Sequence, residues 1–181
     1  MRRQRNLLGP QGMGGMVSLW GASSAVKQIQ YGTITGSSSA TISSVVVENS
    51  IVLWLGNDTN DNAATTSGFT SCILSNSTTV SQAATAAGNV GGFCVLEFLP
   101  GMVKSAGSGT IAVSGVGSAT ATITSVNTSK TILTFLGQTT NDGTPSAQWC
   151  RLALTNSTTI TASRTFASNL VNIRYSYLEF Y

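Results

Sequence analysis

The stretch that decides the fold is Ala121–Val126 (ATITSV), which has a near copy at Ala40–Val45 (ATISSV). Both stretches are uncharged and contain several β-branched residues, which favours short β-strands. Each stretch lies inside a longer segment that the chain repeats with the same order of motifs. The fold is therefore expected to consist of two similar units that are rich in strands.

Further short motifs surround each stretch in the same order and at nearly the same spacing. They are Val-Lys, Gly-Thr-Ile, Leu-Gly, Asn-Ser-Thr-Thr and Leu-Glu-Phe, which begin at residues 26, 32, 55, 76 and 96 in the first copy and at residues 103, 109, 136, 156 and 178 in the second. A period this long, with only two copies, does not match a solenoid. It favours two small domains in tandem that are related by internal duplication.

Short apolar runs in each copy are separated by turn-forming Gly, Asn and Ser, and no segment keeps the 3.6-residue apolar period of a helix. Gln28–Ile34 alternates apolar and polar residues, as a strand with one buried face does. Ser50–Leu55 is mostly apolar and is predicted to be covered on both faces. In the second copy, Gly137–Pro145 is predicted to be a loop and Gln148–Leu154 a strand.

We therefore predict an all-β fold with two tandem antiparallel β-sandwich or small-barrel domains, residues 26–100 and 103–181. Each copy is near the small end for an independent domain and buries only a modest core by itself. Packing of the copies on one another, or association into an oligomer, is expected to supply further stability.

Residues 1–25 differ from both copies and are predicted to form an extended N-terminal arm. The segment Gly9–Gly12 argues against a helix, and it interrupts the apolar run that a cleaved signal peptide needs. The arm carries basic and apolar side chains that could dock on a neighbouring subunit. These candidate interaction residues are Arg2, Arg3, Arg5, Met13, Met16, Leu19 and Trp20. A solvated, disordered tail is the alternative.

The chain carries few charges: 8% of its residues are charged, and the formal net charge is +3 at pH 7. Surfaces with so little charge tend to be covered by partners, which favours a subunit of an assembly. The basic residues form no stripe with interleaved aromatic residues, so direct nucleic-acid binding is not predicted. No apolar run is long enough to span a bilayer, and no membrane partner is predicted.

Residue types that catalyse reactions are scarce. The chain has no histidine, which is the side chain most often used for proton transfer, and it has no nucleophile elbow or phosphate loop. Glu97 and Glu179 occupy matching positions, so a structural role is favoured over a glycosidase pair, and each is predicted to point outward from a core strand. The segment that begins at Asp58 lacks the glycine and the glutamate of a calcium loop. No catalytic residue, metal site or cofactor is predicted, and the chain is not expected to be an enzyme.

The cysteines and tryptophans leave two alternatives open. Cys72, Cys94 and Cys150 fall at positions that do not match between the copies, and they are predicted to be free, buried thiols, with an intermolecular disulfide as the alternative. Trp54 is predicted to lie in the core, whereas Trp149 has no predicted orientation. Exposed tryptophans would favour a sugar site, but the polar loops at 57–67 and 137–145 contain no aromatic residue.

In the order of its motifs, which ends in Asn-Ser-Thr-Thr and Glu-Phe-Tyr, the chain resembles small β-rich virion proteins of tailed bacteriophages. The resemblance covers residues 26–181 and is clearest in the second copy. It implies a non-enzymatic particle component: a capsid decoration (cement) protein, or a collar, tail or fibre subunit. Such proteins commonly form trimers or other symmetric oligomers. The duplication and the arm go beyond the single repeat that is usual in these proteins.

The leading hypothesis from the sequence is a capsid decoration protein that stabilises the shell through its arm and its β-domains. Its expected partners are other virion proteins, either the major capsid protein or neck and tail proteins, together with further copies of itself, with a trimer favoured. Its expected location is the virion, assembled in the cytoplasm of a bacterial host. The alternative is a tail, collar or fibre subunit, including a receptor- or glycan-binding module.

Overall fold

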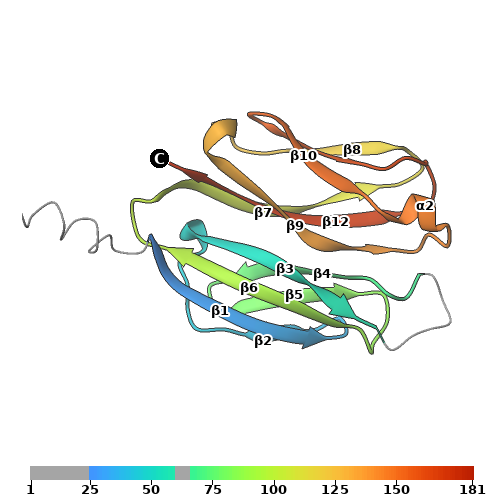
Figure 1. Ribbon diagram of the computed structural model, residues 1–181, viewed down its shortest axis with the longest axis horizontal. Coiled ribbons are helices and arrows are strands. Elements are labelled where there is room, and N and C mark those ends of the chain that lie inside the picture. The colour runs from blue at the N-terminus through green and yellow to red at the C-terminus, as the bar shows by residue number, and fades with distance from the viewer. Residues whose placement is uncertain (1–24, 60–65) are drawn as a thin grey trace, which may run out of the picture.

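The computed structural model describes residues 25–59 and 66–181. In these ranges the chain is an all-β protein whose strands pair antiparallel (Figure 1). The predicted all-β, antiparallel class is therefore confirmed. The arm, apart from Ala25, and all seven candidate interaction residues lie outside the described residues.

The first half of the described chain, residues 25–99, contains one three-stranded sheet and three strands of a larger sheet. Its strands are β1 (Val26–Thr35), β2 (Ser39–Thr41), β3 (Ser50–Asp58), β4 (Thr70–Asn76), β5 (Thr79–Ala84) and β6 (Val90–Phe98), with a short 3₁₀ helix η1 (Val47–Asn49) before β3. The strand orders are β1-β6-β3 and β2-β5-β4. Burial alternates along β1, which confirms the alternation expected there.

The second half, residues 103–181, has the same pairing order. Its strands are β7 (Val103–Val113), β8 (Ser118–Thr122), β9 (Thr131–Thr140), β10 (Arg151–Asn156), β11 (Thr159–Ser163) and β12 (Val171–Phe180), with a 3₁₀ helix η2 (Thr128–Lys130) before β9 and a short helix α2 (Pro145–Gln148) before β10. Strands β7-β12-β9 form one set of neighbours and β10-β11-β8 the other. Residues that the two sequence copies place at matching positions are called counterparts below.

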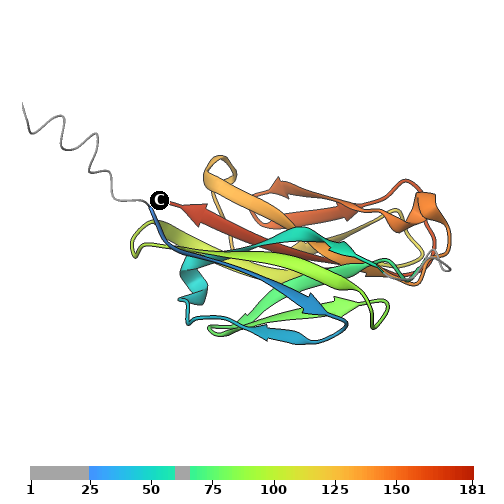
Figure 2. The same ribbon diagram turned by 60° about the horizontal axis from the view of Figure 1, so that its bottom comes forward.

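The halves lie side by side and share one sheet (Figures 1 and 2). Ser71 on β4 pairs with Gly137 on β9, so that β2-β5-β4 continues into β9-β12-β7 as a single six-stranded sheet. A Cβ at Gly137 would lie only 2.3 Å from the carbonyl oxygen of Thr70, and φ at Gly137 is +84°. The close approach and the backbone conformation both require glycine at this position.

Three apolar clusters hold the described residues together. One fills the first half, one fills the second half, and the third joins the halves through Ile51, Phe98, Val103 and Leu178. The cluster of the first half also includes Leu136, a residue of the second half. The rings of Phe98 and Phe180 meet edge to face with centroids 5.2 Å apart, a geometry that aromatic pairs prefer. The two halves therefore share buried apolar surface as well as a sheet.

The structure overturns several local predictions. Residues 145–148 form the helix α2, where a loop and the start of a strand were predicted, because a proline is well suited to the first position of a helix. Strand β3 is buried at its start, but Leu55 near its end is 55% exposed, so the prediction that it is covered on both faces is wrong there. Glu97 and Glu179 are fully buried instead of pointing outward.

Candidate interaction surfaces

The buried carboxylate of Glu97 has a structural environment. It accepts hydrogen bonds from Lys27 Nζ at 2.8 Å and from the backbone N–H of Val46 at 3.0 Å. Burial alone would raise the pKa of Glu97, but these hydrogen bonds, with a further one from Gln28, hold that pKa below its ordinary value. Glu97 therefore ties β1 and the segment before η1 to β6.

Glu179, the counterpart of Glu97, has the same kind of partners. Its carboxylate accepts from Lys104 Nζ at 2.8 Å and from the backbone N–H of Asn127 at 2.8 Å. These hydrogen bonds lower the pKa of Glu179 against the opposing effect of burial. Because both glutamates are enclosed and hydrogen-bonded within the fold, their geometry supports the structural role expected from the sequence and offers no open site to a substrate.

Asp142 and Arg164 form a third buried polar group, near helix α2. Asp142 Oδ1 accepts from the backbone N–H of Thr144 at 2.9 Å, and Asp142 Oδ2 lies 3.6 Å from Arg164 Nη1. The Thr144 N–H, a hydrogen bond from Ser168 and the Arg164 charge together lower the pKa of Asp142. The guanidinium of Arg164 also donates to the carbonyl oxygens of Val116, Ala147 and Ser168. The group therefore fixes the connection from β9 to β10.

No disulfide joins the three cysteines within the chain, and the prediction of buried thiols is confirmed for Cys72 and Cys94 but is wrong for Cys150. Cys72 and Cys94 are buried and Cys150 is partly exposed. Burial raises the pKa of Cys72 to about 12, and the nearby charge of Arg174 offsets only part of this effect. Within the described ranges, no group of three or more His, Cys, Asp or Glu residues could hold a metal ion.

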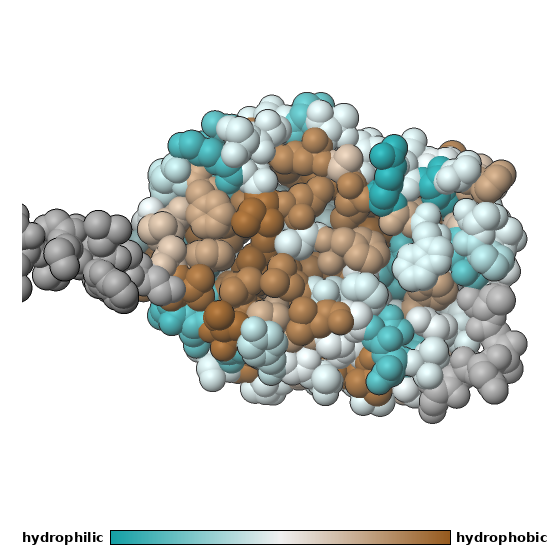
Figure 3. All heavy atoms as spheres, viewed as in Figure 1, coloured by the Kyte–Doolittle hydropathy of each residue, from teal (hydrophilic) through white to brown (hydrophobic). Residues whose placement is uncertain are grey.

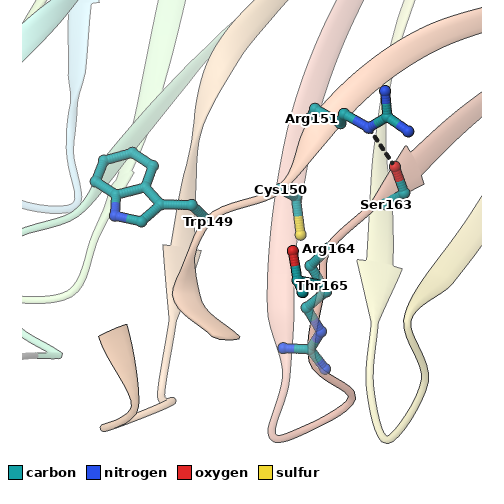
Figure 4. Close-up of a pocket in the computed structure, with 6 residues that line it drawn as sticks. All are labelled: Trp149, Cys150, Arg151, Ser163, Arg164 and Thr165. Carbon is teal, nitrogen blue, oxygen red and sulfur yellow. Dashed lines mark hydrogen bonds between the residues drawn. The ribbon is translucent and has the colours of Figure 1, made fainter. Parts of the chain in front are cut away.

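An open hollow of about 450 Å³ lies beside β10. Figure 4 shows the side chains that line it: Trp149, Cys150, Arg151, Ser163, Arg164 and Thr165. Trp149 is 59% exposed and packs edge to face on Phe69, with centroids 5.2 Å apart. Arg151 Nε donates to Ser163 Oγ, whereas the Arg164 guanidinium points away from Trp149 and is engaged with backbone carbonyls. Trp149 and Arg151 are therefore the groups that this hollow presents to a partner.

The second surface is the outer face of the sheet β1-β6-β3. The pairing register places one alternating set of side chains on this face, and most of them are apolar. They are Ile29, Tyr31, Leu53, Leu55 and Leu96, together with Ile51 and Cys94, which are buried. The second half covers this face at Ile51 and Leu96, so its exposed part lies around Ile29, Tyr31 and Leu55. Tyr31 is 71% exposed and Leu55 is 55% exposed. Figure 3 shows apolar side chains gathered on the face of the molecule that carries this sheet. An exposed apolar patch of this kind marks an interaction site.

At the end of β3 this face is hollowed. The hollow is lined by Thr33, Leu55, Gly56, Asn57, Asp58, Val90 and Gly92. Two of the lining residues are glycines, which have no side chain to fill the hollow. Asp58 places an exposed carboxylate at the rim of the hollow. Sequence patterns missed this surface because a strand with apolar residues on both faces was interpreted as fully covered.

Comparison with protein-family models, with curated proteins and with solved structures gives no match to this chain. None of the helices in residues 25–59 and 66–181 has the length and apolar character needed to cross a membrane.

Proposed function

We propose that the chain is a non-enzymatic structural subunit of a tailed-phage virion, with a capsid decoration (cement) protein as the leading form. The observation that carries this proposal is that carboxylates of the chain are buried whereas several of its apolar side chains are exposed. The buried carboxylates Glu97, Glu179 and Asp142 are held by structural hydrogen bonds, whereas apolar side chains of β1 and β3 are exposed on an open sheet. A surface of that kind suits assembly, which the sequence resemblance also favours.

We further infer that the two halves arose by internal duplication and act as tandem β-sandwich domains, residues 26–100 and 103–181. Their common pairing order supports this inference. So do the matching hydrogen bonds of Glu97 and Glu179 to a lysine near the start of the first strand and to a backbone N–H.

The proposed partners are the major capsid protein, or neck and tail proteins, and further copies of the chain. Residues 1–25 are proposed to anchor the protein through Arg2, Arg3, Arg5, Met13, Met16, Leu19 and Trp20. Apolar side chains on an extended arm gain stability when a neighbour covers them. The proposed location is the virion.

Mass spectrometry of purified particles from a phage that encodes the chain tests this proposal. The expected result is the chain in a fixed ratio to the major capsid protein. Its absence from particles, with abundant protein in the lysate, would overturn the proposal. Particles that lack the chain can then be mixed with the full chain or with a chain lacking residues 1–25. Binding of the full chain alone is expected, and equal binding of both would remove the arm from the mechanism.

A receptor- or glycan-binding module on the particle surface is the second candidate. The exposed Trp149 beside an open hollow favours it, since sugars commonly stack on exposed aromatic rings. Binding of the purified chain to a glycan array, lost in Trp149→Ala, would support this function. The absence of binding to any glycan on the array would reject it.

A further inference from the structure

Leu136 and Leu55 are counterparts with opposite environments. Leu136, on β9, is fully buried and belongs to the apolar cluster of the first half. Leu55, on β3, is 55% exposed on the outer face of β1-β6-β3. One half of the molecule therefore inserts a leucine into its neighbour, while the matching leucine of the other half lies in solvent.

The apolar core of the first half is covered at the place where Leu136 enters it, whereas the matching part of the second core is partly exposed. In the first half, Val52, Cys72 and Leu74 are buried members of the cluster that contains Leu136. Their counterparts Leu133, Leu152 and Leu154 are only partly buried, and they pack at the margin of the second cluster. The second core thus lacks the cover that Leu136 supplies to the first.

The backbone repeats this asymmetry. Gly137 is a positive-φ glycine against which Ser71 of β4 packs directly. Its counterpart Gly56 also has a positive φ, +102°, yet a Cβ built there meets nothing within 4 Å. The counterpart of Ser71 is Arg151, which is exposed. Gly56 on β3 and Arg151 on β10 therefore repeat the two positions that pair between the halves, but within the described residues these two strands do not pair with one another.

The charged residues are compatible with a repetition of this contact. In the contact between the halves the arginine belongs to the face, whereas in the repeated contact it would belong to the edge. Arg174, on β12, reaches the carbonyl oxygens of Ser71 and Ser81 in the first half, 3.2 Å from each. Its counterpart on the open face is Gly92, which leaves room in the hollow beside Leu55. The open edge instead carries Arg151, and in the repeated register Arg151 would lie opposite Gly56, diagonal to the exposed Asp58.

We propose that a second copy of this chain occupies the exposed part of the outer face of β1-β6-β3, around Tyr31 and Leu55. The β9–β10 edge of one molecule packs on that face of the next, with Leu55 filling the open end of the second core and Arg151 facing Asp58. This contact repeats between molecules the contact that the halves make within one molecule. Each chain offers one edge and one face, so the contact is head-to-tail and closes into a ring when its rotation permits.

This inference rests on the structural role proposed above, because a subunit of a symmetric assembly needs such a contact. The two can fail separately, since self-association is measured on the purified full-length chain without any particle. Light scattering after size exclusion gives the mass of the species in solution. The expected result is a mass that is a multiple of the monomer's; a monomer at every concentration reached would overturn the inference.

Substitutions at two exposed positions test the two surfaces of the contact one at a time. Leu55→Glu damages the face and Arg151→Glu damages the edge, and each variant alone is expected to be a folded monomer by circular dichroism and light scattering. Ser39→Glu adds the same charge on β2, outside both surfaces, and is expected to associate like the unmodified chain. A face-to-face dimer would instead lose association with Leu55→Glu and keep it with Arg151→Glu, which would overturn the edge-to-face geometry.

Mixing the two variants is the sharpest test. A chain with Leu55→Glu keeps a good edge and a chain with Arg151→Glu keeps a good face, so the mixture is expected to form a 1:1 dimer. Two monomers in the mixture would overturn the proposal. The arm is the competing occupant of the face: a chain that lacks residues 1–24 is expected to associate unchanged, and loss of association on that deletion would assign the face to the arm.

Discussion

Ser71 of the first half pairs with Gly137 of the second, and this single pairing joins two three-stranded sheets into one of six strands. The approach is close because Gly137 has no side chain. Among the described residues the pairing does not occur in reverse, since a Cβ at Gly56, the counterpart of Gly137, would meet no atom within 4 Å. The contact between the halves is thus asymmetric: the first half contributes β4 and the second half contributes β9. A substitution at a residue in this contact can therefore be compared with the same substitution at its counterpart, which lies outside the contact.

Gly137→Ala is expected to destabilise the chain more than Gly56→Ala. Both glycines have a positive φ, so each alanine costs about 1–2 kcal/mol for the backbone conformation. Only at Gly137 would the new Cβ also meet the carbonyl oxygen of Thr70, at 2.3 Å. Displacing β4 from β9 should add about 1–3 kcal/mol, as overpacking does. Urea unfolding of both variants measures the difference, and equal midpoints would show that the β4–β9 contact contributes nothing to stability.

Leu136→Ala is expected to cost about 2–5 kcal/mol, because it leaves a cavity in the first core. Leu55→Ala, at the exposed counterpart, is expected to change the free energy of unfolding by less than about 0.5 kcal/mol in dilute, monomeric protein. Calorimetry of the two variants checks both values. A small effect of Leu136→Ala would mean that the halves unfold independently of one another.

Particular residues show how far sequence reasoning reached. The alternation of Gln28–Ile34 identified β1 because one face of that strand is exposed and the other is buried. The lack of helical periodicity likewise gave the all-β class. The short helix α2 escaped notice because four residues are too few for a periodic signal, and a proline between polar residues is also typical of a turn.

The environments of Leu55 and Glu97 could not be obtained from the sequence. Leu55 and Leu136 each belong to a Leu-Gly motif, yet Leu55 is exposed and Leu136 is buried. Their burial differs because it depends on which surface of each half meets the other half. Glu97 is buried because Lys27, 70 residues away, reaches it. Both facts are long-range, whereas periodicity reports only local order. The matching positions of Glu97 and Glu179 were nevertheless enough to favour a structural role for the pair.

Alkylation of the native chain at mildly alkaline pH is expected to modify Cys150 before the other two cysteines. The thiolate is the reactive form, and burial raises the pKa of Cys72 to about 12 and also raises that of Cys94. Cys150 also has a raised pKa, but its side chain is partly exposed to the reagent. Mass spectrometry of peptides after a short reaction gives the order. Rapid modification of native Cys72 would contradict its burial, whereas all three should react in urea.

Acid is expected to destabilise the chain through Glu97 and Glu179. Their pKa values in the folded state lie below the ordinary 4.5, so the unfolded chain binds protons first as the pH falls. Their contribution is therefore complete above pH 4.5 and is lost as the pH falls through the lowered pKa. Urea midpoints measured from pH 7 down to pH 3 should decline over this window.

Glu97→Gln removes the contribution of Glu97 to this effect and tests its origin. The variant loses the charge-assisted hydrogen bond from Lys27, which should cost about 2 kcal/mol at neutral pH. Its urea midpoint should then fall less between pH 7 and pH 3 than that of the unmodified chain. Glu48→Gln, at an exposed position on η1, is the matched control and should keep the full pH dependence. An unchanged acid response in Glu97→Gln would assign the destabilisation to other carboxylates.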